Sequence, residues 1–135
     1  MLVISGDNVE SDLTETVSDT FIHCLASNTV EKMPSIRIGR TSFAAHYDFG
    51  DRFVYVIGGS VKNGKMIKNC EKFDILNQKW VEMPELNFER GNPGTFISKD
   101  RRYLYVFKGF VNSMVDNGKK HSEALHSIER LDLWN

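Results

Sequence analysis

Few side chains in this sequence are grouped as catalytic or metal-binding chemistry would require. The four histidines, His23, His46, His121 and His126, do not have metal-ligand spacing, and the two that would share a loop, His121 and His126, have no cysteine or dense carboxylate cluster beside them. His23 and Cys24 are adjacent, but on a strand their side chains would point to opposite faces. The sequence therefore predicts no catalytic residue, no metal site and no cofactor.

Lysines gather in two segments that could attract an acidic partner. Residues 60–69 carry Lys62, Lys65 and Lys68 without an acid, and Lys119-Lys120 lie in a later segment. A basic rim of this kind would bind an acidic segment of a partner protein. The alternative is that these lysines only keep the loops soluble.

Arg40 and Arg90 recur about 50 residues apart, which allows two interpretations. They either bind an acidic partner at the base of neighbouring loops, or act as framework residues that bond strand carbonyl groups. The later segment also contains four apolar residues, which either pack onto the domain or form a partner site: Phe110, Val111, Met114 and Val115.

Composition places the chain among ordinary globular proteins. It has 135 residues, of which 41% are hydrophobic and 26% charged, and this length suits one domain. A formal net charge of −1 gives no overall attraction to nucleic acid or anionic lipid. The sequence has no apolar run long enough to span a membrane and no signal peptide, so we expect a cytoplasmic protein with two reduced cysteines.

An internal repeat organises the chain. An offset of about 50 residues aligns Met33-Pro34 with Met83-Pro84, and residues 52–59 with residues 102–109. The offset then lengthens, because residues 71–77 resemble residues 129–135, which indicates an insertion of about eight residues before residue 129.

Short apolar segments separated by turn residues predict strands in each repeat. The middle copy reads as four strands, over residues 41–47, 53–57, 70–76 and 79–83. The continuous apolar run over residues 53–57 suggests burial on both faces of a sheet. In the outer copies we expect strands over residues 2–4, 20–25, 29–33, 95–98, 103–107 and 127–133.

The middle copy resembles the Kelch repeat of β-propeller proteins. The matching residues follow one another in the order of that motif: Gly58, Gly59, Glu71, Phe73, Asp74, Trp80 and Pro84. The resemblance implies an all-β fold, a partial Kelch-type β-propeller made of four-stranded antiparallel blades. Gly58 is replaced by Lys108 and Trp80 by Val30 in the other copies, so only the middle blade is a full match.

The strand inventory predicts about two and a half blades. Residues 1–34 form an incomplete first blade with its second to fourth strands, residues 35–84 a complete blade, and residues 85–135 a third blade that lacks its outer strand and has a loop insertion at 110–127. Because a propeller closes with roughly four to eight blades, we expect the remaining blades from a longer parent chain or from another subunit.

We expect a protein–protein interaction module or scaffold without enzymatic activity, since long loops on a rigid scaffold are where binding residues concentrate. The resemblance implies roles such as actin binding or substrate recruitment as a ubiquitin ligase adaptor. The predicted partner-binding residues are Arg40, Arg90, Ser60, Lys62, Lys65, Lys68, Phe110, Asn112, Lys119 and Lys120.

Two alternatives remain. Some proteins that resemble Kelch propellers are oxidases or sugar-modifying enzymes, although the copper-binding set of Tyr, His and Cys is not visible here. The chain would otherwise be a purely structural part of a large assembly.

Overall fold

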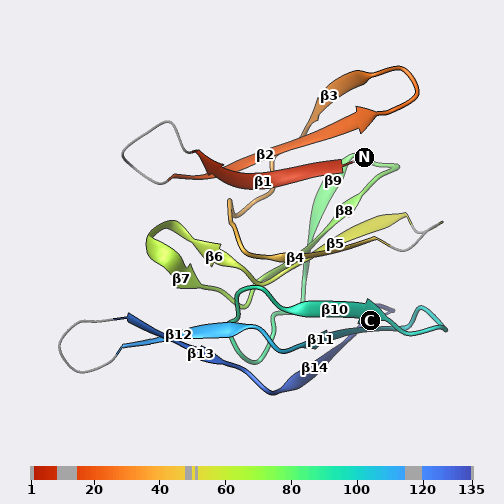
Figure 1. Ribbon diagram of the computed structural model, residues 1–135. Helices are drawn as coiled ribbons and strands as arrows, with labels where there is room; N and C mark the ends of the chain where they lie inside the picture. Colours follow the sequence, from red (N-terminus) through yellow and green to blue (C-terminus); the bar gives the residue numbers. More distant parts are fainter. Residues whose placement is uncertain (1, 9–14, 48–49, 51, 115–119, 135) are drawn as a thin grey trace.

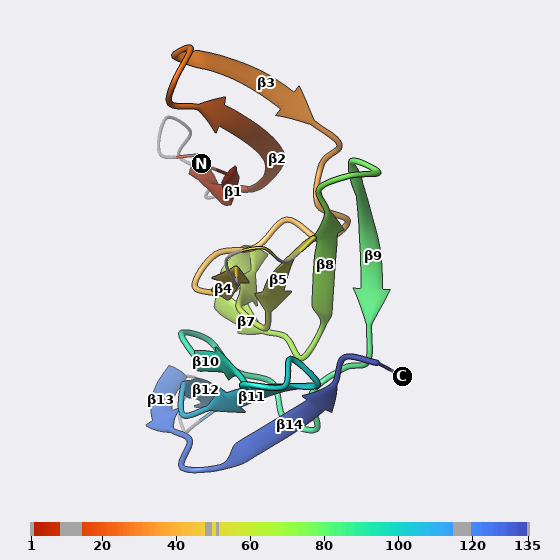
Figure 2. The ribbon, with the colours of Figure 1, turned by 90° about the vertical axis from the view of Figure 1, so that its right-hand side faces the viewer.

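The computed structural model describes the chain except for residues 1, 9–14, 48–49, 51, 115–119 and 135. Three antiparallel sheets follow one another along the chain and stack face to face (Figures 1 and 2). In the described residues the only helical element is the 3-10 turn η1, Lys62–Gly64, and no helix is long and apolar enough to cross a membrane.

The middle sheet has four strands in the order β4-β5-β8-β9, with bounds Ala44–Tyr47, Phe53–Ile57, Cys70–Asp74 and Lys79–Met83. Strand β5 is buried along most of its length because sheets cover both of its faces, as its apolar run predicts. Its β-branched and aromatic side chains suit a strand of this kind. Pro84 follows β9 directly, and its missing N–H cannot extend the ladder.

The outer sheets are incomplete versions of the middle one. The first sheet has the order β1-β2-β3, with strands Leu2–Asn8, Glu15–Cys24 and Thr29–Met33, and β1 carries an irregularity between Ile4 and Gly6. The third sheet has the order β10-β11-β14, with strands Gly94–Ile97, Tyr103–Phe107 and Ile128–Asp132.

Two hairpins occupy segments that the sequence predicted as loops, and this prediction is wrong. Strands β6 (Ser60–Val61) and β7 (Lys65–Met66) flank η1, and strands β12 (Phe110–Met114) and β13 (Lys120–Ala124) fill much of the insertion. Each hairpin pairs through an isolated bridge with the segment before the first strand of its own blade, Ser60 with Thr41 before β4 and Phe110 with Gly91 before β10. Main-chain pairing therefore continues beyond the blades and fixes the direction of both hairpins.

Apolar side chains fill both spaces between the sheets. Between the first and middle sheets lie Met33, Val54 and Phe73, with Trp80 packed against them. The larger cluster lies between the middle and third sheets and consists of Ala44, Tyr55, Ile57, Cys70, Leu86, Leu104, Val106 and Leu131. These layers hold the blades as one stack, and the all-β, partial-propeller fold class that the sequence predicted is confirmed.

Candidate functional site

Arg40 and Arg90 lie inside the fold, and their predicted role as direct partner contacts is wrong. Both are 0% exposed. Arg40 Nη1 donates to the carbonyl oxygens of Gly58 at 3.1 Å and Asn69 at 2.8 Å, and its Nη2 bonds the Glu71 carboxylate. Because both guanidinium groups are buried and bond oxygen atoms of their own repeat, the framework interpretation describes both residues.

Arg90 repeats this arrangement in the third sheet. Its Nη1 donates to Lys108 O at 2.9 Å, and its Nη2 donates to Glu129 at 2.5 Å and to the Ser127 hydroxyl at 2.9 Å. Burial lowers the pKa of Arg40, and the neighbouring Glu71 opposes this effect. The middle and third repeats thus each contain one buried ion pair between the linker and the third strand.

The two carboxylates also hold the linkers that enter each blade. Glu71 accepts a hydrogen bond from the Arg37 backbone N–H at 3.2 Å. Glu129 accepts bonds from the backbone N–H groups of Asn87 at 2.5 Å and Phe88 at 3.2 Å. The buried arginine–glutamate pair of each of these two blades therefore stabilises both the linker and the third strand.

The glycine pair of the middle blade meets the next repeat. Gly58 and Gly59 have φ values of +60° and +104°, and a Cβ on Gly58 would lie 2.5 Å from the carbonyl oxygen of Arg90. Gly59 N–H donates to that same carbonyl at 2.9 Å. Only glycine allows this approach without displacing the backbone, which explains the motif.

The two hairpins lie side by side on one side of the stack, at the left of Figure 1. Asn112 of β12 donates its side-chain N–H to the carbonyl of Gly64 at 2.7 Å and accepts a bond from the Ser122 hydroxyl at 2.9 Å. Met66 of β7 packs over Gly91, where an added Cβ would lie 2.6 Å from its Sδ. We call this combined surface of residues 60–66 and the described parts of 110–124 the hairpin face.

Some of the predicted partner-binding residues are exposed on the hairpin face. Lys62 and Lys65 are exposed, and the Phe110 side chain is 45% exposed. Val111 is half-buried. Lys119, Val115 and the side chains of Met114 and Lys120 lie outside the described residues.

Two other predicted contacts are less available. Ser60 is buried, and its hydroxyl lies 3.1 Å from that of Thr41. Lys68 forms an ion pair with Glu85, with 2.9 Å between Nζ and Oε2. The structure thus corrects Ser60 to a framework residue and gives Lys68 a partner within the chain.

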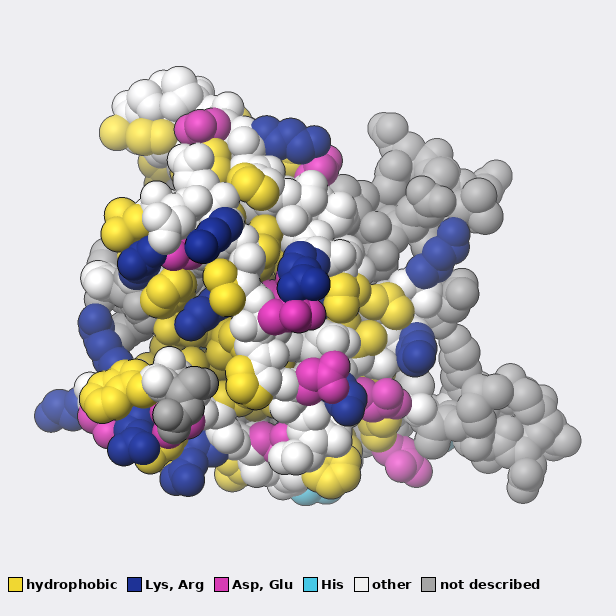
Figure 3. Space-filling model, turned by 180° about the vertical axis from the view of Figure 1, so that it is seen from behind, with side chains coloured by type: hydrophobic (Ala, Val, Ile, Leu, Met, Phe, Trp, Pro, Cys, Tyr) yellow, Lys and Arg dark blue, Asp and Glu magenta, His cyan; other side chains and the backbone are white. Residues whose placement is uncertain are grey.

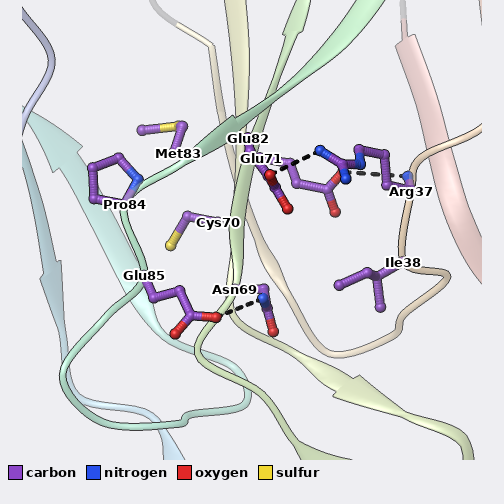
Figure 4. A pocket seen from close by; sticks show the side chains of 9 residues that line it. All are labelled: Arg37, Ile38, Asn69, Cys70, Glu71, Glu82, Met83, Pro84 and Glu85. Carbon is purple, nitrogen blue, oxygen red and sulfur yellow. Dashed lines mark hydrogen bonds and ion pairs between the residues drawn. The ribbon is translucent and has the colours of Figure 1, made fainter.

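A groove that the sequence did not reveal lies beside the linkers, with a volume of about 490 Å³ (Figure 4). Its walls carry Arg37, Asn69, Glu82 and Glu85, together with the buried carboxylate of Glu71. Arg37 pairs with Glu82 at 3.0 Å, and Asn69 donates to Glu85 at 2.8 Å. These residues come from separate segments whose approach depends on the fold, so no local pattern predicts the groove.

Trp80 fills the edge between the first two sheets, where the motif places it. Its ring lies 5.2 Å from that of Phe73, measured between centroids, and its Nε1 donates to the carbonyl of Pro34 at 2.9 Å. Asp74 of the same motif bonds Arg52 Nε at 2.7 Å, and this bond is the main reason that the pKa of Asp74 lies below its ordinary value. The structural motif residues therefore serve packing and turn geometry.

The two cysteines are placed differently in the fold. Cys24 is exposed and Cys70 is buried, and both are free thiols. Burial raises the pKa of Cys70 to about 12, so this thiol stays protonated at neutral pH. The described residues contain no group of three or more His, Cys, Asp or Glu side chains that could hold a metal ion.

Charges of both signs are mixed on the rear face. Figure 3 shows Lys and Arg side chains interspersed with Asp and Glu side chains and with apolar ones. Among the coloured residues of that view, no extended basic surface stands out as a nucleic-acid-binding face would.

Comparisons with known proteins agree with the repeat. The family model described as the Kelch motif matches residues 54–87. A RING finger domain and kelch repeat-containing protein of Dictyostelium discoideum is 33% identical over 99 residues, which cover 73% of this chain and 9% of that protein. A kelch repeat-containing protein of the same organism is 26% identical over 92 residues, which cover 68% of this chain and 13% of that protein.

A plant protein shows a longer match. The F-box/kelch-repeat protein of Arabidopsis thaliana is 26% identical over 119 residues, which cover 88% of this chain and 31% of that protein. The chain thus spans between 9% and 31% of the length of the curated relatives it matches.

Proposed function

Because this chain belongs to the Kelch-repeat family, we propose that it is a protein-interaction module that binds a partner protein through the hairpin face. Kelch repeats are generally protein-interaction modules. The observation that carries the choice of face is the bond between Asn112 and the Gly64 carbonyl, at 2.7 Å, which joins two hairpins from successive repeats into one surface.

The described residues favour an acidic partner segment with an apolar side chain. Lys62 and Lys65 supply positive charge on one hairpin, and Phe110 supplies an exposed aromatic surface on the other. Aromatic residues are enriched at protein interfaces, and rim charges mainly set the association rate and its salt dependence. Arg40 and Arg90 contribute by fixing the blades beneath this surface.

The test captures partners from a lysate of the source cells with three versions of the full chain. These are the wild type, a Lys62→Glu/Lys65→Glu variant and a Lys79→Glu control, whose substitution lies at the opposite end of the blade. We expect the double charge reversal to remove a protein that both other versions retain, and added salt to weaken its capture. Equal capture by all three versions would contradict the proposal.

A more specific proposal is that the captured protein is a substrate delivered to a ubiquitin ligase. The support is that two matched relatives combine Kelch repeats with a RING finger domain or an F-box in their names. This role is expected in the cytoplasm, where the two free thiols would remain reduced. Its check is whether the partner's half-life lengthens when the gene for the full protein is deleted.

Actin binding remains a prediction of the resemblance, and co-sedimentation of the chain with actin filaments would test it. We propose that the module has no catalytic activity of its own. Stoichiometric copper in the purified protein would contradict this and favour an oxidase.

A further inference from the structure

Ser122 of β13 holds one end of the bridge that joins the two hairpins, which lie side by side in Figure 1. It lies directly opposite Asn112 in the β12–β13 ladder. Its hydroxyl donates to Asn112 Oδ1 at 2.9 Å, and Asn112 Nδ2 donates to the carbonyl of Gly64 at 2.7 Å. The orientation of this one amide group is therefore set from both ends, by a hydroxyl donor and by a carbonyl acceptor.

The sequence before Ser122 matches what basic-directed serine kinases select. Among all serines and threonines of the chain, only Ser122 has a lysine or arginine at both the second and the third position before it, Lys120 and Lys119. Kinases of this class have an acidic substrate cleft, which favours positive side chains at these two positions through charge complementarity. The spacing therefore distinguishes Ser122 from every other hydroxyl of the chain.

The Ser122 hydroxyl is accessible in the fold. The residue is exposed, as are its neighbours His121 and Glu123. It lies in a strand, and an extended segment is the conformation in which kinases take up their substrates. Its bond to Asn112 can be exchanged for a bond to solvent or to a kinase, because both residues lie at the surface.

We propose that Ser122 is a phosphorylation site and that its phosphate separates the two hairpins. A kinase transfers the γ-phosphoryl group of ATP to Ser122 Oγ: the O–P bond forms, the bond from that phosphorus to the departing ADP oxygen breaks, and the hydroxyl proton leaves to the kinase. This inference rests on the proposed function, since it assigns a means of regulation to the hairpin face.

Phosphorylation reverses the hydrogen-bond role of Ser122. The ester has no O–H to donate, and it brings three acceptor oxygens and a charge of about −1.5 to −2 at pH 7. Asn112 Oδ1 then faces acceptors. The amide relieves this repulsion by rotating so that Nδ2 donates to the phosphate, which turns Oδ1 towards the Gly64 carbonyl and breaks the bridge.

The same phosphate changes the charge of the hairpin face. Lys62 and Lys65 lie on either side of Gly64 in the chain, and both are exposed. A phosphate on the neighbouring hairpin offsets their positive charge and repels an acidic partner segment. Loss of the bridge and loss of positive charge act in the same direction, so phosphorylation should weaken partner binding.

The first test incubates the full chain with ATP and the catalytic subunit of cAMP-dependent protein kinase, a basic-directed serine kinase. We expect one added phosphate in the intact mass, located on Ser122 by fragmentation and absent from Ser122→Ala. Lys120→Ala should be phosphorylated about tenfold more slowly. A synthetic peptide of residues 117–126 is the positive control. Phosphorylation of the peptide but not of the chain, or of neither, would overturn the proposal.

Amide exchange then examines the bridge without any partner. In the phosphorylated chain the Lys65 amide should exchange about tenfold faster than in the unmodified chain, because the Gly64 carbonyl has lost its donor. Asn112→Ala should show the same increase without phosphate, and kinase-treated Ser122→Ala should not. Unchanged exchange in a fully phosphorylated chain would contradict the separation of the hairpins.

Partner capture distinguishes this regulation from the proposed function. The phosphorylated chain should retain about tenfold less of the protein that Lys62→Glu/Lys65→Glu also loses, and phosphatase should restore its capture. If the double variant loses the protein and the phosphorylated chain keeps it, the regulation is overturned and the proposed function stands. If both keep it, the proposed function is contradicted and the regulation fails with it.

Discussion

Each buried arginine holds a strand and a linker together through contacts that a lysine could not reproduce. The planar guanidinium of Arg40 reaches two carbonyls and the Glu71 carboxylate from one position, and Arg90 does the same with Glu129. A lysine offers a single charged centre on a flexible stem. In the first sheet Phe21 occupies the position of Glu71.

Replacing Arg40 with leucine should destabilise the chain by about 3–5 kcal/mol, because Glu71 is left buried and unpaired. A double variant, Arg40→Leu/Glu71→Leu, should recover much of this loss. Urea denaturation measures both. The control is Arg37→Ala, which breaks the exposed pair with Glu82 and should cost about 0–1 kcal/mol; an equally small cost for Arg40→Leu would contradict the framework role.

Asp74 should contribute stability that acid removes. Its pKa in the folded chain is lowered, first by the hydrogen bond from Arg52, whereas an unfolded aspartate titrates near about 3.9. The contribution is therefore fully present above that pKa and declines as the pH falls below it. The stability gap between the wild type and Asp74→Asn should narrow from about pH 6 to about pH 3 in urea titrations.

The control for this pH series is Val30→Thr, an exposed substitution that changes no titratable group. The free energy of unfolding of this variant should follow that of the wild type in parallel across the pH range. A gap between wild type and Asp74→Asn that stays constant across the acid range would show that the carboxylate does not act through its lowered pKa.

Gly58 and Lys108 occupy corresponding positions in the middle and third blades, so their substitution gives a matched comparison. Gly58→Ala should destabilise by about 2 kcal/mol or more, because the new Cβ meets the Arg90 carbonyl in a left-handed conformation. Lys108→Gly should change stability by about 1 kcal/mol or less. Thermal unfolding of both variants checks this difference, and similar melting temperatures would contradict the account of the blade contact.

At the scale of elements, the hairpin face depends on one side-chain bridge between β12 and the η1 turn. Asn112→Ala should change global stability by about 1 kcal/mol or less, as for a typical hydrogen bond. Amide exchange at Lys65 should become faster, and partner capture should fall. Ser122→Ala retains the Gly64 bond and should have a smaller effect; the reverse order would show that the hairpins are not joined in this way.

Most blade strands were predictable because each is a short apolar run with a clear boundary. Residues 29–33, 53–57, 79–83 and 103–107 form strands over the predicted ranges, flanked by turn residues or proline. The hairpins were missed because β6 and β7 have two residues each, β13 is mostly polar, and β12 has neither alternating polarity nor the continuous apolar run of a blade strand. The Asn63-Gly64 and Asn117-Gly118 pairs were the local hairpin signals in the sequence.

The site was less predictable than the fold. The residues around Arg40 in the sequence do not show whether its side chain faces a partner or the interior. The contacts of Arg40 with Asn69 and with Glu71 of β8 place it in the interior. The groove likewise forms only because the linker residues Arg37 and Ile38 lie beside residues 69–71 and 82–85. Contacts between residues that are distant in the sequence therefore determine which side chains are buried and which line the groove, and local motifs do not reveal this.

At the scale of the whole molecule, three sheets stack in chain order and share two apolar layers. This leaves the hairpins of successive repeats on one side, so the stack acts as a platform for a single composite surface. The matched relatives are several times longer, and in them a segment of this kind would be one part of a larger assembly.

The central claim, that a partner is held by the hairpin face, is tested most directly by site-specific photocrosslinking in the source cells. A photoreactive amino acid is placed at Lys62 or, as the matched control, at Lys79. The account predicts a covalent adduct with one discrete protein from Lys62 and no such adduct from Lys79. The same adduct from both positions, or from Lys79 alone, would contradict it.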